Sequence, residues 1–208
     1  MNFLTIQAHL DDRELSYGIV KTLSGISDRT ISLTTCNGRF MFDRELRTKV
    51  HTGISEEMGI IDVMGRAPDL GLDTERFNFI VDGIYTNISE YNPDVIMIHS
   101  EEDLHQDHKL LSRASKIAIE RYVRDNGKVK TKVIEVLHPS MFNRGDDFLV
   151  VELNDDTFMR KKELCSRYTT EKLTPLKQEY FKVYSSETKK IKRHNLFTES
   201  ALKDFVLN

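Results

Sequence analysis

The sequence predicts an α/β fold in which a mostly parallel β-sheet lies between two layers of helices. Short β-like runs alternate with helical patterns along the chain, and such alternation is typical of βαβ units. Residues 94–99 (DVIMIH) are almost wholly apolar, as expected for a strand that a parallel sheet buries on both faces. Because neither a repeat nor a low-complexity linker interrupts the pattern, we expect residues 1–208 to form one domain.

The expected strands are short apolar or β-branched runs at residues 3–7, 30–35, 60–64, 94–99, 129–137 and 148–153. The expected helices have apolar residues at helical spacing and cover residues 15–23, 42–58, 77–91, 110–123, 158–168, 173–184 and 199–206. This order predicts a three-layer, Rossmann-like fold with a helical C-terminal segment at about residues 155–208. Ligands of such folds bind at the carboxyl ends of the strands, so we expect the active site there.

Composition and charge narrow the classes of partner and compartment. The net charge of -3 provides no general attraction to nucleic acid or to an anionic membrane, so neither is expected as a partner. No apolar run approaches the roughly 20 residues that span a bilayer, and the first residues lack the features of a signal peptide. The two cysteines, Cys36 and Cys165, predict neither a disulfide framework nor a cysteine zinc site, which favours a cytoplasmic location.

Two clusters of histidine and aspartate follow two of the expected strands. Residues 8–12 (AHLDD) come directly after the first strand, and residues 103–108 (DLHQDH) follow strand 94–99. A parallel sheet would bring both clusters to the same edge. Together they offer three histidines and four carboxylates, a suitable ligand set for zinc with one position left for water.

These residue types are also those of a hydrolytic centre. Water bound to zinc has a pKa of about 7, a nearby carboxylate can act as general base, and a spare histidine can stabilise an oxyanion. Each cluster alone could equally be composed of caps and turn residues, and Asp107 could simply cap a helix. The two clusters together favour a metal site.

The paired motifs resemble those of the PIG-L/LmbE-like zinc-dependent N-deacetylases. That family has A-H-P-D-D-E after its first strand and H-x-D-H later, where this chain has AHLDDRELSYG and HQDH. The resemblance covers most of the chain. It implies a hydrolase that uses zinc-bound water to remove an acetyl group from an N-acetylated amino sugar, such as an N-acetylglucosamine derivative, or from a glycoconjugate. The implied cofactor is Zn²⁺, with other divalent metals such as Fe²⁺ as alternatives.

The resemblance also implies roles for individual residues. The zinc ligands would be His9, Asp12 and His108. Asp11 would be the general base that deprotonates the water and later protonates the leaving amine. His105 would polarise the acetyl carbonyl and stabilise the oxyanion.

Four further residues receive weaker assignments. Asp107 would orient a ligand histidine. Arg47 corresponds to a substrate-contacting arginine of the family, although it could also be a charged residue on the wet face of a helix. Asp69 resembles an acidic turn residue that could bind a sugar hydroxyl, or it could serve the turn alone. Arg13 could meet an anionic substrate group such as a phosphate, or it could be a solvated residue at a helix start.

The first motif departs from the family pattern at two positions. Leu10 replaces the usual proline, which removes a backbone restraint. Arg13 replaces the usual glutamate and reverses a charge near the expected metal. Neither change removes a ligand or the base, so we expect activity.

Two other functions fit the same residues. The set His9, Asp11 and His108 could form the two-histidine, one-carboxylate triad of a non-haem Fe(II) oxygenase. That triad normally occurs on an all-β jelly roll, and the helical periodicities argue against it. The chain could also be a catalytically inactive metal- or sugar-binding member of the family, with the changes at Leu10 and Arg13 accompanying a loss of turnover.

Overall fold

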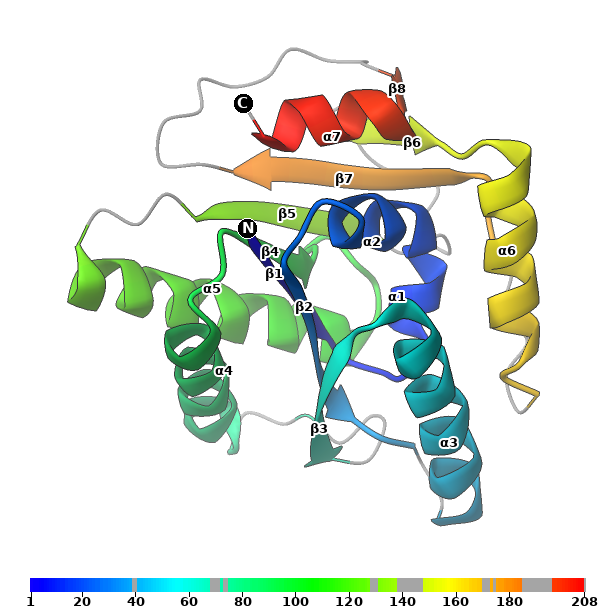
Figure 1. The fold of residues 1–208 in the computed structure, drawn as a ribbon. Coiled ribbons are helices and arrows are strands. Elements are labelled where there is room, and N and C mark those ends of the chain that lie inside the picture. The colour runs from blue at the N-terminus through cyan, green and yellow to red at the C-terminus, as the bar shows by residue number, and fades with distance from the viewer. Residues whose placement is uncertain are drawn as a thin grey trace.

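The computed structural model describes residues 1–38, 41–67, 72, 75–127, 131–137, 148–169, 173, 175–184 and 196–207. Figure 1 shows an α/β fold, which confirms the predicted class. In chain order the elements are β1 (Asn2–Gln7), α1 (Asp12–Leu15), α2 (Tyr17–Ser24), β2 (Arg29–Cys36), α3 (Met41–Met58), β3 (Ile61–Ala67), α4 (Phe77–Tyr91), β4 (Val95–His99), α5 (Gln106–Asn126), β5 (Lys132–Leu137), β6 (Leu149–Glu152), α6 (Asp155–Ser166), β7 (Gln178–Tyr184), β8 (Leu196–Thr198) and α7 (Glu199–Leu207).

The described strands form one sheet in the order β3-β2-β1-β4-β5-β7-β6-β8. Strands β1 to β5 are parallel, β7 runs antiparallel to both β5 and β6, and β8 is parallel to β6. The chain proceeds from β1 outward to β3 and then crosses to β4 on the other side of β1. The order of the strands therefore reverses between β1 and β4. Ligands of open α/β sheets bind at the carboxyl side of such a switch point.

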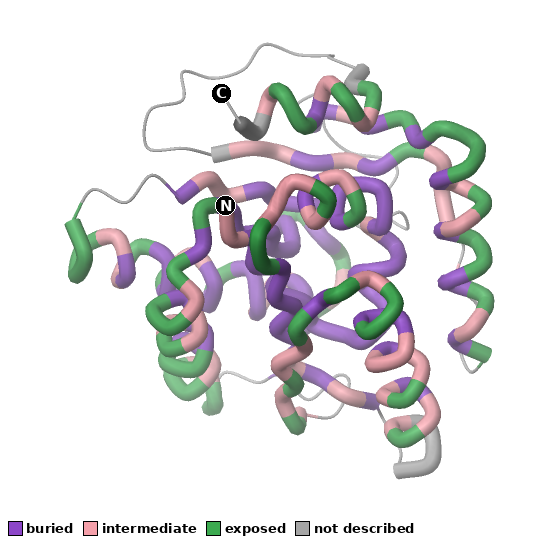
Figure 2. The backbone as a smooth tube through the Cα atoms, viewed as in Figure 1, coloured by how far each residue is buried: buried purple, intermediate pink, exposed green. Residues whose placement is uncertain are grey.

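Helices bury both faces of the sheet because successive side chains of a strand point to opposite faces. In β1, Leu4 and Ile6 pack in one core cluster with side chains of α4 and α5, whereas Phe3 packs in a second cluster with side chains of α2 and α7. Figure 2 shows the resulting band of buried backbone through the central strands. This double burial explains why β4 is apolar at almost every position.

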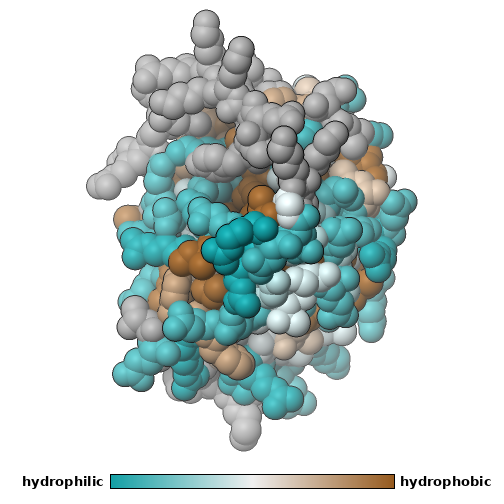
Figure 3. Space-filling view, turned by 90° about the vertical axis from the view of Figure 1, so that its left-hand side faces the viewer, coloured by the Kyte–Doolittle hydropathy of each residue, from teal (hydrophilic) through white to brown (hydrophobic). Residues whose placement is uncertain are grey.

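The outer surface is mostly polar on the side that carries α4 and α5. Figure 3 shows hydrophilic side chains over most of this face, with smaller hydrophobic areas among them. None of the described helices combines the length and the apolar composition that crossing a membrane requires.

The C-terminal third differs from the prediction. A helix was expected at residues 173–184, but Gln178–Tyr184 forms β7 in the sheet, and the expected helical segment at 155–208 also contains β8. The sequence QEYFKVY alternates, so that Glu179 and Phe181 point to the same side and are both buried. The alternation is easily missed because a buried glutamate breaks the usual rule that charged residues face water.

Glu179 is buried because it is fully paired. Its carboxylate accepts hydrogen bonds from the backbone N–H groups of Gly18 (2.9 Å) and Ile19 (2.8 Å) at the start of α2. Its Oε1 also lies 2.8 Å from the ammonium of Lys161, which α6 supplies. A Cβ at Gly18 would come within 2.1 Å of a methyl carbon of Leu153, so glycine permits this close approach. One carboxylate thus joins α2, α6 and β7.

We predict that Glu179→Gln destabilises the fold by about 3–5 kcal/mol, because it leaves the buried Lys161 ammonium without its counter-charge. Urea unfolding measures the change in free energy. The matched control is Asp155→Asn, which breaks an exposed pair of similar length (2.7 Å to Lys177) and should change stability little. Equal losses in the two variants would contradict the role of the buried pair.

Candidate metal centre

The two His/Asp clusters meet where β1 and β4 end. The backbone N–H of Ala8 donates to Nε2 of His99 (3.0 Å), and the carbonyl of Ala8 accepts from the N–H of Cys36 (2.8 Å). These contacts fasten the end of β1 to the ends of β4 and β2. The β1–α1 loop, residues 8–11, therefore faces the segment that leads from β4 into α5, as the sequence predicts.

The three predicted zinc ligands converge on one point. Nδ1 of His9 lies 3.2 Å from Nε2 of His108. Oδ2 of Asp12 lies 3.5 Å from that His9 nitrogen, and Oδ1 of Asp12 lies 3.3 Å from that His108 nitrogen. Ligand atoms placed about 2.0–2.1 Å from a tetrahedral zinc ion are roughly 3.3–3.4 Å apart. The spacing and chemistry of this ligand trio, His9, Asp12 and His108, therefore fit zinc.

Each ligand histidine has a carboxylate at its other ring nitrogen. Nε2 of His9 lies 3.0 Å from Asp107 Oδ2, and Nδ1 of His108 lies 2.9 Å from Asp103 Oδ2. Such partners fix the ring orientation and tautomer of metal-binding histidines. Asp107 lies beside His9, and its predicted orienting role stays a prediction. This double arrangement is a further reason why the trio fits a metal.

Sequence reasoning assigned no role to Asp103, the partner of His108. Burial acts to raise the pKa of its carboxyl, but the hydrogen bond with His108 and the charge of that ring outweigh burial and lower the pKa to about 2. The carboxylate is therefore ionised at neutral pH. The signal was present in the sequence, because Asp103 opens the same D-x-H-x-D-H run as the predicted residues.

His99 was also missed. Its ring stacks on that of His108 with centroids 3.9 Å apart, and its Nε2 lies 3.1 Å from Asp12 Oδ2. Asp12, His99 and His108 thus form an alternative group of potential ligands. However, the His99 Nε2 lone pair accepts the N–H of Ala8, so we assign His99 to holding the loop. Burial, reinforced by the charge of His108, lowers the pKa of His99 and favours its neutral form.

The predicted base, Asp11, is held by Arg47. Nη2 of Arg47 lies 2.6 Å from Asp11 Oδ1, and the arginine is only 3% exposed, so it is not on the wet face of its helix. Burial and the charge of Asp12 raise the pKa of Asp11 to about 6, against the opposing charges of Arg47 and His9. A general base works best when its pKa lies near the working pH. The predicted contact of Arg47 with a substrate stays a prediction.

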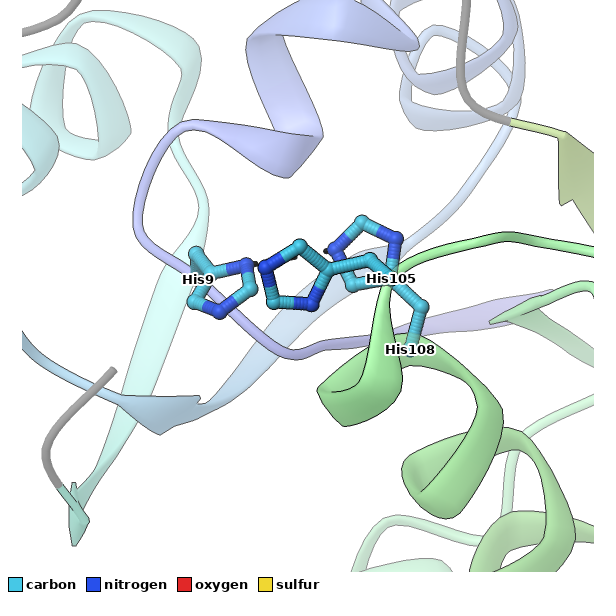
Figure 4. Close-up of side chains that lie close together, drawn as sticks. All are labelled: His9, His105 and His108. Atoms are coloured by element: carbon cyan, nitrogen blue, oxygen red, sulfur yellow. Dashed lines mark hydrogen bonds between the residues drawn. The ribbon is translucent and has the colours of Figure 1, made fainter. Parts of the chain in front are cut away.

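His105 is at the N-cap of α5 and faces the ligand rings. Its Nδ1 accepts the backbone N–H of Asp107 (3.2 Å), so the neutral ring carries its hydrogen on Nε2. Figure 4 shows the rings of His9, His105 and His108 gathered between the β1–α1 loop and the start of α5. Burial and the charges of His108 and His9 lower the pKa of His105. A neutral imidazole with a defined N–H is a suitable donor to an oxyanion.

The same three histidines form a second potential ligand set. One nitrogen from each of His9, His105 and His108 lies within 4.8 Å of the others, and three-histidine zinc sites are common. In that set His105 would replace Asp12 as a ligand. The two assignments differ in a single residue and can be separated by experiment.

The structure also locates the two remaining predicted residues. Arg13 is 1% exposed, and its guanidinium pairs with Glu14 (2.7 Å) and donates to Ser55 (2.6 Å). The expectation of a solvated residue is therefore wrong, and this placement gives no support to a contact with substrate. Asp69 lies outside the described residues.

A separate cavity of about 370 Å³ lies between β3 and α4. Its lining is largely apolar and includes Val63, Met64, Phe79 and Ile80. No residue of the ligand trio lines it, so we assign it no part in the chemistry of the metal centre.

Comparison with known proteins shows the fold. No protein-family model matches the chain, and no curated protein matches it. Among solved structures, the zinc-inhibited form of teicoplanin deacetylase Orf2 matches with a TM-score of 0.65 at 12% identity, over 91% of this chain and 100% of that one. N,N'-diacetylchitobiose deacetylase from Pyrococcus horikoshii matches with a TM-score of 0.59 at 16% identity, over 81% of this chain and 70% of that one.

A third match shows that this fold serves more than one reaction. GalB, the 4-carboxy-2-hydroxymuconate hydratase from Pseudomonas putida KT2440, matches with a TM-score of 0.64 at 13% identity, over 92% of this chain and 99% of that one. The chain therefore has the α/β fold of the PIG-L/LmbE-type deacetylases, and the predicted resemblance is confirmed at the level of the fold. The reaction must be argued from the site.

We predict that the protein binds zinc and that Asp12→Ala lowers its zinc affinity more than roughly a hundredfold, because loss of an orienting partner alone costs 10–100-fold. The matched variant His105→Ala should keep the wild-type affinity. Competition with a chromophoric chelator measures both. The reverse pattern, with zinc lost in His105→Ala and kept in Asp12→Ala, would identify the three-histidine set as the ligands.

Proposed function

We propose that this protein is a zinc-dependent hydrolase of the PIG-L/LmbE type that removes the acetyl group from an N-acetylated amino sugar or glycoconjugate. The observation that carries the proposal is the convergence of Nδ1 of His9, Nε2 of His108 and the carboxylate of Asp12. The two nitrogens are 3.2 Å apart, and one oxygen of Asp12 lies 3.5 Å from His9 while the other lies 3.3 Å from His108. The fold shared with two deacetylases supports it.

The residues around the trio provide the other parts of an amide hydrolysis. A zinc ion in this site would act as a Lewis acid, lowering the pKa of a water molecule to about 7 and polarising the acetyl carbonyl. Asp11 accepts a proton from the attacking water while Arg47 holds one of its carboxylate oxygens. His105 donates its Nε2–H to the oxyanion that forms as the carbonyl carbon becomes tetrahedral.

Breakdown of the tetrahedral species completes the reaction. Asp11 returns the proton to the amide nitrogen, the C–N bond breaks, and acetate and a free amine leave. Asp107 and Asp103 keep the two ligand rings in place throughout. The substrate is a small N-acetylated molecule, and loops at this edge of the sheet select it.

The two alternatives from the sequence receive less support. An Fe(II) oxygenase that uses Asp11 as a ligand would need its carboxylate at the metal, whereas Arg47 binds that carboxylate 2.6 Å away. An inactive binding protein would not need a base whose pKa burial raises to about 6 beside the ligand trio. Acetate release distinguishes a deacetylase from a binding protein or a hydratase, because only the deacetylase forms acetate.

We predict that Asp11→Asn keeps zinc binding and lowers kcat for acetate release by roughly 10²–10⁴-fold, because the amide cannot accept the proton of water. Asp82→Asn, which alters an exposed carboxylate on α4, is the control and should match the wild type. Undiminished turnover in Asp11→Asn would refute the mechanism.

The assay uses a panel of free N-acetyl sugars, nucleotide sugars, lipid-linked glycans and thiol-precursor glycosides. Zinc binding without acetate release from any of them would support the inactive binding protein instead.

A further inference from the structure

We propose that His51 and Tyr168 are positioning residues that clamp the backbone carbonyl of Leu10 and so set the relative placement of His9 and Asp11. This inference rests on the proposed function, because it concerns the residues that would hold and serve the metal. Neither side chain carries out the reaction itself. Both act through one peptide group of the β1–α1 loop.

The Leu10 carbonyl receives two short hydrogen bonds from distant parts of the chain. Nδ1 of His51, on α3, lies 2.7 Å from the Leu10 oxygen, and the hydroxyl of Tyr168, just beyond α6, also lies 2.7 Å from it. A carbonyl oxygen only accepts, so both side chains must donate. Two donors satisfy both lone pairs of the oxygen, and the peptide cannot rotate without losing a buried hydrogen bond.

A ring of polar side chains surrounds the two donors. The His51 ring also faces Asp62, with its Nε2 3.1 Å from Oδ1. Asp62 lies 3.4 Å from the guanidinium of Arg13, which pairs with Glu14 at 2.7 Å. The other oxygen of Glu14 lies 3.2 Å from the Tyr168 hydroxyl, whose single hydrogen the Leu10 carbonyl accepts at 2.7 Å.

Arg13 ties this ring to α3 by two further bonds. Its Nη1 donates to Ser55 Oγ (2.6 Å), and its Nη2 donates to the carbonyl of His51 (3.3 Å). The guanidinium stays charged, and its planar donors keep Glu14 beside Tyr168.

Packing supports the same geometry. The Leu10 side chain is fully buried in a small apolar cluster that also contains Tyr17, Ile54, Leu164 and Tyr168. The aromatic ring of Tyr168 thus lies in the same apolar cluster as the residue whose carbonyl its hydroxyl binds. The side chain and the backbone of Leu10 are therefore both immobilised by elements outside the loop.

The clamp matters because Leu10 stands between a ligand and the base. A rotation of its peptide would displace His9 on one side and Asp11 on the other. Catalytic groups that are misplaced by about 1 Å can cost a hundredfold in rate. Loss of a partner that orients a ligand typically costs 10–100-fold in metal affinity or activity.

The first test compares Tyr168→Phe with Tyr122→Phe. Tyr122 is also buried, and its hydroxyl donates to Asn92 at 2.6 Å on the α4–α5 side of the sheet, so the control removes the same group far from the loop. We expect Tyr168→Phe to lower both the zinc affinity of the apoprotein and kcat by roughly 10–100-fold, with KM unchanged. Tyr122→Phe should change neither. Equal zinc affinity and kcat in the two variants would overturn the proposal.

The second test changes His51 in two ways and covers the case in which Tyr168→Phe does not fold. His51→Asn keeps a donor close to the position of Nδ1, whereas His51→Leu removes it. We expect His51→Asn to retain more zinc affinity and a higher kcat than His51→Leu, and thermal unfolding shows whether each variant is folded. Indistinguishable zinc affinities would overturn the clamp. Failure of the wild type to bind zinc would instead refute the proposed function.

Discussion

The parallel pairing of β1 with β4 is the constraint on which the rest of the site depends. Their register sets Phe3 opposite Val95 and Thr5 opposite Met97, so both strands end at the same edge of the sheet. The chain reaches β4 only after building β2 and β3 on the far side of β1. Two loops that are about ninety residues apart are therefore brought together at the switch point, and one bond from Ala8 to His99 joins them directly.

The buried charges at this edge suit a site that holds a metal ion. Asp12, Asp103 and Asp107 are nearly or fully buried, and bringing carboxylates out of water is costly unless each is paired. His9 pairs with Asp107, and His108 pairs with Asp103. The carboxylate of Asp12 lies near the rings of His9, His99 and His108. A bound dication would balance these carboxylates and use the lone pairs that face the centre. Buried carboxylates next to histidines are typical of functional sites, where residues that serve the reaction can lower the local stability.

The sequence predicts the parallel strands and the two motifs better than it predicts the residues that hold the site in place. The strands of the parallel part follow from periodicity, because burial on two faces leaves an apolar run such as that of β4. Both His/Asp clusters are found by their place after two of those strands. The proposed metal ligands lie in the segments that lead from β1 into α1 and from β4 into α5, and the two motifs make them visible in the sequence. β7 escapes prediction because Glu179 is buried by partners on α2 and α6, which no local pattern reveals.

Supporting residues are harder to predict because their partners are remote in the sequence. Asp103 stands only five residues before His108 and could have been found from the motif. His51 and Tyr168 are 41 and 158 residues from Leu10, so no spacing rule connects them with the loop. Their roles follow from distances between elements. This is the general limit of reading a site from sequence: ligands occur in motifs, whereas the groups that hold those motifs are contributed by the fold.

The two departures from the family motif, Leu10 and Arg13, both contribute to holding the β1–α1 loop in place. A proline at position 10 would restrain the backbone through its own ring. Here Leu10 is restrained by packing in the cluster with Tyr168 and by two donors on its carbonyl. Arg13, in place of glutamate, orders the Glu14 carboxylate beside one of those donors. The charge reversal is directed away from the ligand trio, into the support of the loop. Leu10 and Arg13 thus both contribute to the support of the same loop.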